Sequence, residues 1–104
     1  MNFDEYQNRA KSFAMYPDEV ELAYLTLGLS GEAGEIANKV KKVFRDGREI
    51  SREDMKSELG DVLWYVANLA KAYDLSLSEV AESNIDKLQS RADRGKIQGE
   101  GDNR

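Results

Sequence analysis

Apolar residues recur every three or four positions through most of this 104-residue chain, and Pro17 is its only proline. This is the period of an α-helix that buries one face, because about 3.6 residues make one helical turn. The pattern predicts four helices, over residues 3–15, from just after Glu19 to Phe44, over 51–73 and over 78–91. Short connections between helices favour antiparallel neighbours, so the expected fold is all-α and similar to a four-helix bundle.

The ends of these helices carry local signals. Pro17 ends the first segment, and Asp46-Gly47 breaks the second. Ser51, with Asp54 three residues later, is similar to a capping box and is expected to open the third helix.

The chain is expected to form one small domain, residues 1–94, followed by a flexible tail, residues 95–104. Three of the ten tail residues are glycine, and the tail has almost no apolar content. A chain of this length buries only a modest core, so a partner subunit is expected.

Composition excludes several kinds of chemistry. The formal net charge is −5, from 20 acidic and 15 basic residues, which argues against a nucleic-acid partner. Without cysteine or histidine there is no zinc–thiolate site, no thiol nucleophile and no imidazole base, which leaves carboxylate and metal chemistry. No segment approaches the roughly 20 apolar residues of a membrane span, and the N-terminus does not resemble a signal peptide. We therefore expect a soluble, cytoplasmic protein without a membrane partner.

Two acidic motifs, Glu32-Ala-Gly-Glu35 and Glu58-Leu-Gly-Asp61, are separated by the 22 residues 36–57. Residues i and i+3 share one helix face, so each motif presents two carboxylates to the same side. Both pairs border the apolar stripe of their helix, which favours a shared site over a solvated acidic surface. Carboxylates held together repel unless a cation lies between them, and all-oxygen sites suit Mg²⁺ or Mn²⁺.

Four glycines lie inside the same two predicted helices: Gly28, Gly31, Gly34 and Gly60. Each costs helix stability, on the order of 1 kcal/mol relative to alanine. They allow either close helix packing or room for metal, water and phosphate beside the carboxylates.

Asn84, Lys87 and Arg91 lie along one edge of the fourth predicted helix. They either face the acidic site and bind phosphate, or form a polar edge in solvent. Lys39 follows Glu35 by four residues, which predicts an ordinary ion pair within the helix.

Trp64 projects from the side of its helix opposite the apolar stripe, and Asn68 follows it one turn later. Two roles remain open for the indole ring, burial in a subunit interface or stacking on a nucleobase. In the second case Asn68 would hydrogen-bond the base or sugar. Gln7 and Lys11 are further candidate pocket residues.

These motifs together resemble the MazG-like nucleotide pyrophosphohydrolases of the all-α nucleoside triphosphate pyrophosphatase superfamily. The resemblance rests on Gly31-Glu-Ala-Gly-Glu-Ile36, Glu58-Leu-Gly-Asp-Val-Leu-Trp-Tyr65 and Asn84-Ile-Asp-Lys-Leu-Gln-Ser-Arg91, and it extends over nearly the whole chain. It implies Mg²⁺-dependent hydrolysis of nucleoside or deoxynucleoside triphosphates between the α and β phosphates, which yields a monophosphate and pyrophosphate and serves nucleotide-pool housecleaning. It also implies a homodimer or homotetramer.

Carried onto this sequence, the resemblance implies metal ligation by Glu32, Glu35, Glu58 and Asp61. Either glutamate of the first motif would act as the general base. Asn84, Lys87 and Arg91 would contact phosphate.

The nucleotide remains open at this stage. A dUTP or dCTP specialist and a phosphoribosyl-ATP pyrophosphatase use similar acidic helices. From a different class, a non-catalytic helical module would use the acidic face and Trp64 to bind a protein partner.

Overall fold

The computed structural model describes all residues, 1–104, and consists of helices without a β-strand. The prediction of an all-α chain is confirmed. In chain order the elements are α1 (Phe3–Lys11), the short 3₁₀ helix η1 (Asp18–Val20), α2 (Glu21–Asp46), α3 (Arg52–Ala72) and α4 (Leu77–Asp93). None of these helices is both long enough and apolar enough to cross a lipid bilayer.

The first helix is shorter than its apolar pattern predicts. α1 ends at Lys11 rather than near Met15, and the N–H groups of residues 12–14 donate to carbonyls three residues back. The Ser12 hydroxyl also donates to the Arg9 carbonyl at 2.6 Å. A serine side chain that competes for backbone carbonyls in this way favours the end of a helix.

Serine caps begin the last two helices. Ser51 Oγ accepts a hydrogen bond from the backbone N–H of Asp54 at 3.0 Å, as its sequence position predicts. Ser76 and Glu79 form a reciprocal capping box, which starts α4 one residue earlier than expected. α2 ends at Gly47, whose φ of 68° is left-handed and suits a residue without a Cβ atom.

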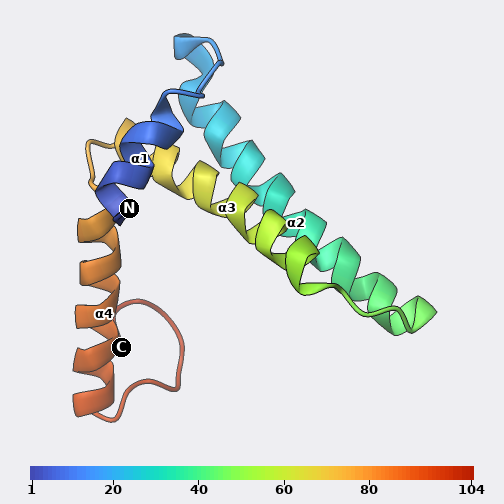
Figure 1. The fold of residues 1–104 in the computed structure, drawn as a ribbon. Coiled ribbons are helices and arrows are strands. Elements are labelled where there is room, and N and C mark those ends of the chain that lie inside the picture. Colours follow the sequence, from blue (N-terminus) through green and yellow to red (C-terminus); the bar gives the residue numbers. More distant parts are fainter.

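The helices do not close into a bundle within one chain. α2 and α3 form a long side-by-side pair, α1 packs on α3, and α4 contacts α1 and α3 but not α2, so the chain has the shape of an open V (Figure 1). The radius of gyration is 16.4 Å. A compact domain of this length would have one of about 13 Å. The bundle-like expectation is therefore correct for the helical content but not for the packing of a single chain.

Gln7 ties α1 to the start of α4. Its side-chain amide donates to the carbonyls of Ala67 and Leu75, at 3.1 and 2.9 Å, and its Oε1 accepts from the N–H of Leu77 at 3.0 Å. Gln7 is buried, and all three bonds satisfy backbone groups near the α3–α4 turn. It is therefore a structural residue, and although it also lines a polar pocket of about 350 Å³, its role in binding a substrate stays a prediction.

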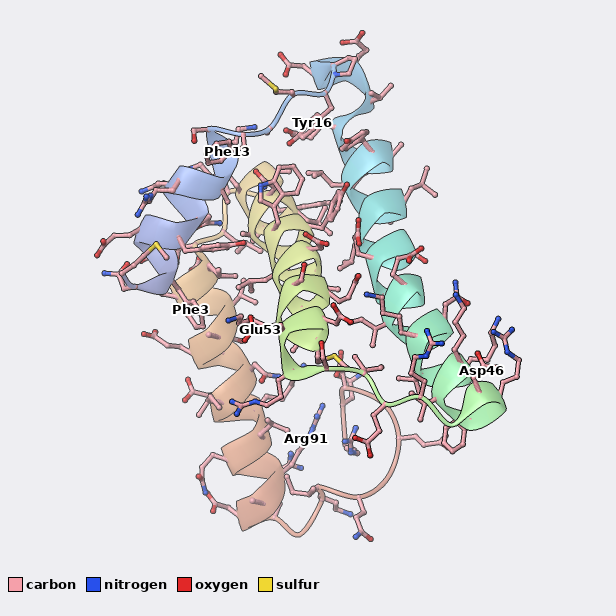
Figure 2. All side chains as sticks on the ribbon, turned by 45° about the vertical axis from the view of Figure 1, so that its right-hand side comes forward. Phe3, Phe13, Tyr16, Asp46, Glu53 and Arg91 are labelled. Atoms are coloured by element: carbon pink, nitrogen blue, oxygen red, sulfur yellow. The ribbon has the colours of Figure 1, made fainter.

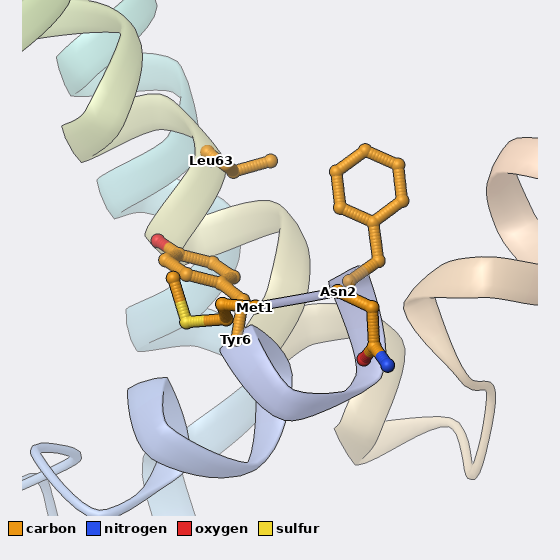
Figure 3. A pocket seen from close by; sticks show the side chains of 5 residues that line it. Met1, Asn2, Tyr6 and Leu63 are labelled. Atoms are coloured by element: carbon orange, nitrogen blue, oxygen red, sulfur yellow. The ribbon is translucent and has the colours of Figure 1, made fainter.

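Much apolar surface remains open to solvent. Only 8 of the 104 residues are buried, and the central cluster consists of Ala10, Ala67 and Leu77 with partly buried neighbours. Figure 3 shows an apolar pocket between α1 and α3, of about 420 Å³, lined by Met1, Asn2, Phe3, Tyr6 and Leu63. On α4, Ile85 is 63% exposed. Exposed apolar area of this extent is typical of a subunit contact.

Candidate metal centre

Glu32 of α2 and both Glu58 and Asp61 of α3 meet where the two helices pack together. Each contributes a carboxylate oxygen to a group in which all the oxygens lie within 4.8 Å of one another. The two acidic motifs thus converge, as their spacing predicts, and we call these three residues the acidic group. Glu35, one helical turn after Glu32, lies outside the group and is exposed. Its role as a ligand or base stays a prediction.

Electrostatic repulsion within the acidic group is visible at Glu32. Burial raises the pKa of Glu32, and the charges of Asp61, Glu58 and Glu35 raise it further. The folded protein therefore disfavours the ionised form of this side chain, and a cation between the carboxylates would reverse that preference.

Glu58 has one bonded and one free oxygen. Its Oε1 lies 3.0 Å from Nζ of Lys39, whereas Oε2 is buried without a hydrogen-bond partner. A buried oxygen without a donor is costly to the fold, and a cation ligated by carboxylates would satisfy it. The donor set, which contains oxygen alone, fits Mg²⁺ or Mn²⁺.

Lys39 pairs with Glu58 rather than with Glu35, so the predicted ion pair within the helix is wrong. The bond to Glu58 raises the pKa of Lys39. The Glu58 side chain is only 15% exposed, and a carboxylate shielded from water attracts an ammonium more strongly than an exposed one.

Three tyrosine rings extend from the first loop toward the acidic group. Tyr16 and Tyr24 are stacked with centroids 4.8 Å apart, and Tyr24 lies 6.3 Å from Tyr65. Burial raises the pKa of Tyr65, with further contributions from Tyr24, Glu32 and Asp61. The sequence gives no sign of this row, because its members lie on three different elements.

Gly28 provides the space that Tyr65 occupies. A Cβ atom at Gly28 would overlap the Tyr65 ring, whereas one at Gly31, Gly34 or Gly60 would meet no neighbour within 4 Å. Close packing is therefore the reason for the first glycine, and the other three leave open surface on the same two helices.

Trp64 does not project outward. Its indole Nε1 donates to the Ala10 carbonyl at 3.1 Å, and the ring packs against the central apolar cluster. Asn68 is buried, and its amide donates to the Trp64 carbonyl at 3.0 Å. The expectation of an outer face is wrong because α1 covers this side of α3. Trp64 is partly buried and Asn68 fully so, and their contact with a nucleotide stays a prediction.

No ion pair joins the cations of α4 to the acidic group of their own chain, and α4 makes no contact with α2, which carries Glu32. Lys87 Nζ and Arg91 Nη2 instead converge on Oδ1 of Asp102, at 3.1 and 3.2 Å. These bonds lower the pKa of the Asp102 carboxyl, Lys87 most and Arg91 next. Asn84 is exposed on the same helix.

The tail folds back along α4, and its C-terminus lies beside the middle of that helix (Figure 1). Arg91 is buried, and its side chain reaches from α4 toward the loop of the tail (Figure 2). The Arg104 guanidinium donates to the carbonyls of Lys96 and Ile97, at 3.1 and 3.0 Å, and Arg94 donates to the Arg104 carbonyl at 2.7 Å. Composition gives no indication of these bonds.

A family model described as the MazG nucleotide pyrophosphohydrolase domain matches residues 21–95, which include both acidic motifs and α4. The chain is 54% identical over 114 aligned positions to the Gene 37 protein of Mycobacterium phage L5, and the alignment covers both proteins completely. It is 39% identical over 72 residues to the uncharacterized protein YvdC of Bacillus subtilis strain 168, across 61% of this chain and 68% of that one. No solved structure matches. The chain belongs to the MazG nucleotide pyrophosphohydrolase domain family.

Proposed function

We propose that this protein is a Mg²⁺-dependent pyrophosphohydrolase of nucleoside or deoxynucleoside triphosphates, active in nucleotide-pool housecleaning. It cleaves between the α and β phosphates and releases a monophosphate and pyrophosphate. The observation that carries the proposal is the acidic group of Glu32, Glu58 and Asp61, with carboxylate oxygens within 4.8 Å of one another, in a chain of this family. Mn²⁺ is the expected substitute for Mg²⁺.

The acidic group and Glu35 would hold the metal. A bound divalent cation lowers the pKa of a water ligand and neutralises phosphate charge. Glu32 or Glu35 takes the proton of the attacking water. The raised pKa of Glu32 does not decide between them, because its cause includes neighbouring carboxylates that a cation would neutralise. No covalent nucleophile is required.

We further propose a homodimer or homotetramer in which α4 of one subunit serves the acidic group of another. The open V, the exposed apolar surface and the lack of contact between α2 and α4 support this arrangement. Opposite charges favour it too, since three carboxylates would face Lys87 and Arg91. To bind phosphate, these two cations exchange the carboxylate of Asp102 for phosphate oxygens.

The row of Tyr16, Tyr24 and Tyr65 supports a nucleotide substrate. Tyr24 is 44% exposed and lies next to the ring that adjoins the acidic group. Aromatic faces of this kind stack on nucleobases with little dependence on which base is bound.

A screen for pyrophosphate release tests the proposal. All common ribonucleoside and deoxynucleoside triphosphates are incubated with the protein and Mg²⁺ or Mn²⁺, with Asp61→Asn as the control. We expect equimolar monophosphate and pyrophosphate from at least one substrate and none from the control. Release of orthophosphate instead, or no hydrolysis with either cation, would refute it. Calorimetric binding of a non-hydrolysable triphosphate only in the presence of Mg²⁺ would separate an enzyme from a protein-interaction module.

A further inference from the structure

Lys39 is the only cation that contacts the acidic group. Glu32 and Asp61 form no ion pair, whereas Glu58 has Lys39 at 3.0 Å from one of its two oxygens. Lys39 follows Glu32 by seven residues, two helical turns, so both side chains lie on the face of α2 that packs on α3.

The two oxygens of Glu58 are therefore in different states. Oε1 accepts the ammonium of Lys39, and Oε2 is buried without any partner. The Glu58 side chain is 15% exposed and that of Lys39 is 36% exposed, so water competes only weakly for this bond at the carboxylate. With Oε1 held by Lys39, Oε2 is the oxygen of Glu58 that has no partner and is free to bind a cation.

The number of oxygens that a carboxylate offers matters for the choice of metal. Ca²⁺ takes about six to eight oxygen ligands, and carboxylates often bind it through both oxygens. Mg²⁺ requires near-octahedral geometry at shorter distances, which single carboxylate oxygens and waters supply. Mn²⁺ shares the preference for oxygen ligands in an octahedron.

We propose that Lys39 is a specificity-determining positioning residue, which limits Glu58 to one ligating oxygen and so disfavours Ca²⁺ relative to Mg²⁺ and Mn²⁺. The inference rests on the proposed function in one respect, namely that a divalent cation binds at the acidic group. Lys39 acts through Glu58 and has no contact of its own with substrate in this account.

An ion pair without this role makes a different prediction. A lysine that merely adds positive charge weakens the binding of every divalent cation alike, because Mn²⁺ and Ca²⁺ carry the same charge. The ratio of the two affinities cancels that general effect. A change in the ratio of the two affinities therefore indicates a change in how many oxygens of Glu58 can bind the cation.

The test is calorimetric titration of the metal-free, full-length protein with Mn²⁺ and, separately, with Ca²⁺. The variants are Lys39→Met, which removes the bond to Glu58, and Lys41→Met, which makes the same change in charge at a position without an ion pair on the same helix. Circular dichroism and thermal melting establish that each variant is folded.

We expect Lys39→Met to raise the affinity for Ca²⁺ relative to Mn²⁺ by about tenfold, the lower end of the effect of residues that hold metal ligands. Lys41→Met should leave the ratio at the wild-type value. An unchanged ratio in Lys39→Met, with both cations bound, would overturn the role of Lys39 and leave the metal site standing. A wild-type protein that binds neither cation would overturn the metal site, and with it this inference.

Discussion

In the proposed site, the α2–α3 pair supplies the metal ligands and α4 supplies the phosphate-binding cations, and the chain prepares these two parts to different degrees. The acidic group is assembled within the chain, from side chains on two helices that pack along their length. No ion pair joins the cations of α4 to it, and the tail of the same chain occupies them. One half is thus preformed and the other depends on what binds next to it. This difference is the basis of the proposal that assembly and substrate binding complete the site.

The physical cause of the difference lies in how each helix is held. α2 and α3 have 26 and 21 residues, and each stabilises the other through a continuous interface. α4 is fixed at its first turn, where Gln7 binds the N–H of Leu77 and Asp4 binds that of Ser78. Further along, Ile85 stays exposed and no helix of the same chain covers it.

The largest expected effect distinguishes metal binding by the acidic group from phosphate binding by α4. Asp61→Asn should reduce hydrolysis by more than about 100-fold, beyond the loss seen when only a residue supporting a metal ligand is changed. Calorimetry should show weakened Mn²⁺ binding. In the other half, Lys87→Ala should keep Mn²⁺ binding and raise KM for the triphosphate by about tenfold, the worth of one charged hydrogen bond. Equal loss of Mn²⁺ binding in both variants would contradict the assignment of metal binding to the acidic group and of phosphate binding to α4.

The second prediction concerns the exposed side of α4. Ile85→Asp should convert the oligomer to monomer at low micromolar concentration, because a carboxylate cannot be buried unpaired in an apolar contact. Sedimentation velocity provides the measurement. Ser83→Asp adds the same charge at a polar position of this helix and should leave the oligomer intact. A wild-type protein that sediments as an active monomer would refute the arrangement itself.

The third prediction tests how tightly the preformed half is packed. Gly28→Ala should lower the free energy of unfolding by about 1–3 kcal/mol, the usual cost of overpacking, because the new Cβ overlaps Tyr65. Gly31→Ala meets no neighbour in the chain and should raise it, by up to about 1 kcal/mol, through helix propensity. Chemical denaturation of both variants gives the comparison, and effects of the same sign would contradict it.

The smallest expected effect is a pH dependence of the metal-free protein. Burial and the neighbouring carboxylates raise the folded pKa of Glu32, so the folded state binds more protons than the unfolded state. The free energy of unfolding should therefore fall as pH rises from about 4.3, the ordinary glutamate pKa, through the raised value. The lowered pKa values of Asp46 and Asp102 act below this window.

Thermal melts from about pH 4 to 7 measure this dependence, because the range begins near the ordinary pKa of glutamate and extends above it. Glu32→Gln should flatten the fall, and Glu100→Gln, an exposed carboxyl of the tail, should leave it unchanged. A melting temperature that rises across the window in wild type and not in Glu32→Gln would reverse the sign and contradict the account.

The sequence predicts the preformed half well because its signals are local. Helical period places Glu32, Glu58 and Asp61 on the helix faces that pack together, whereas Glu35, predicted by the same spacing, lies outside the group. The cap at Ser51 is also correct. Prediction from the sequence fails where the outcome depends on contacts between distant segments. The position of α1 decides the burial of Trp64, and nothing in the spacing of residues 64–68 indicates what covers them.

The ion pair of Lys39 is a second case in which tertiary packing, rather than local spacing, decides the contact. Its spacing from Glu35 suits a pair within the helix, yet the better partner is Glu58 on α3, which is more shielded from water. Choices between competing partners depend on burial, and burial follows from tertiary packing. The bond of the tail to Lys87 and Arg91 is likewise a contact that composition does not encode.

The most direct test of the central claim is complementation between two inactive variants. Asp61→Asn chains are mixed with chains that carry Lys87→Ala and Arg91→Ala, and the mixture is unfolded and refolded together. If α4 serves the acidic group of the other subunit, each mixed dimer has one intact site, and random pairing should restore about a quarter of wild-type pyrophosphate release. Activity that stays at the level of the separate variants would show that both halves act within one chain, and would contradict the account.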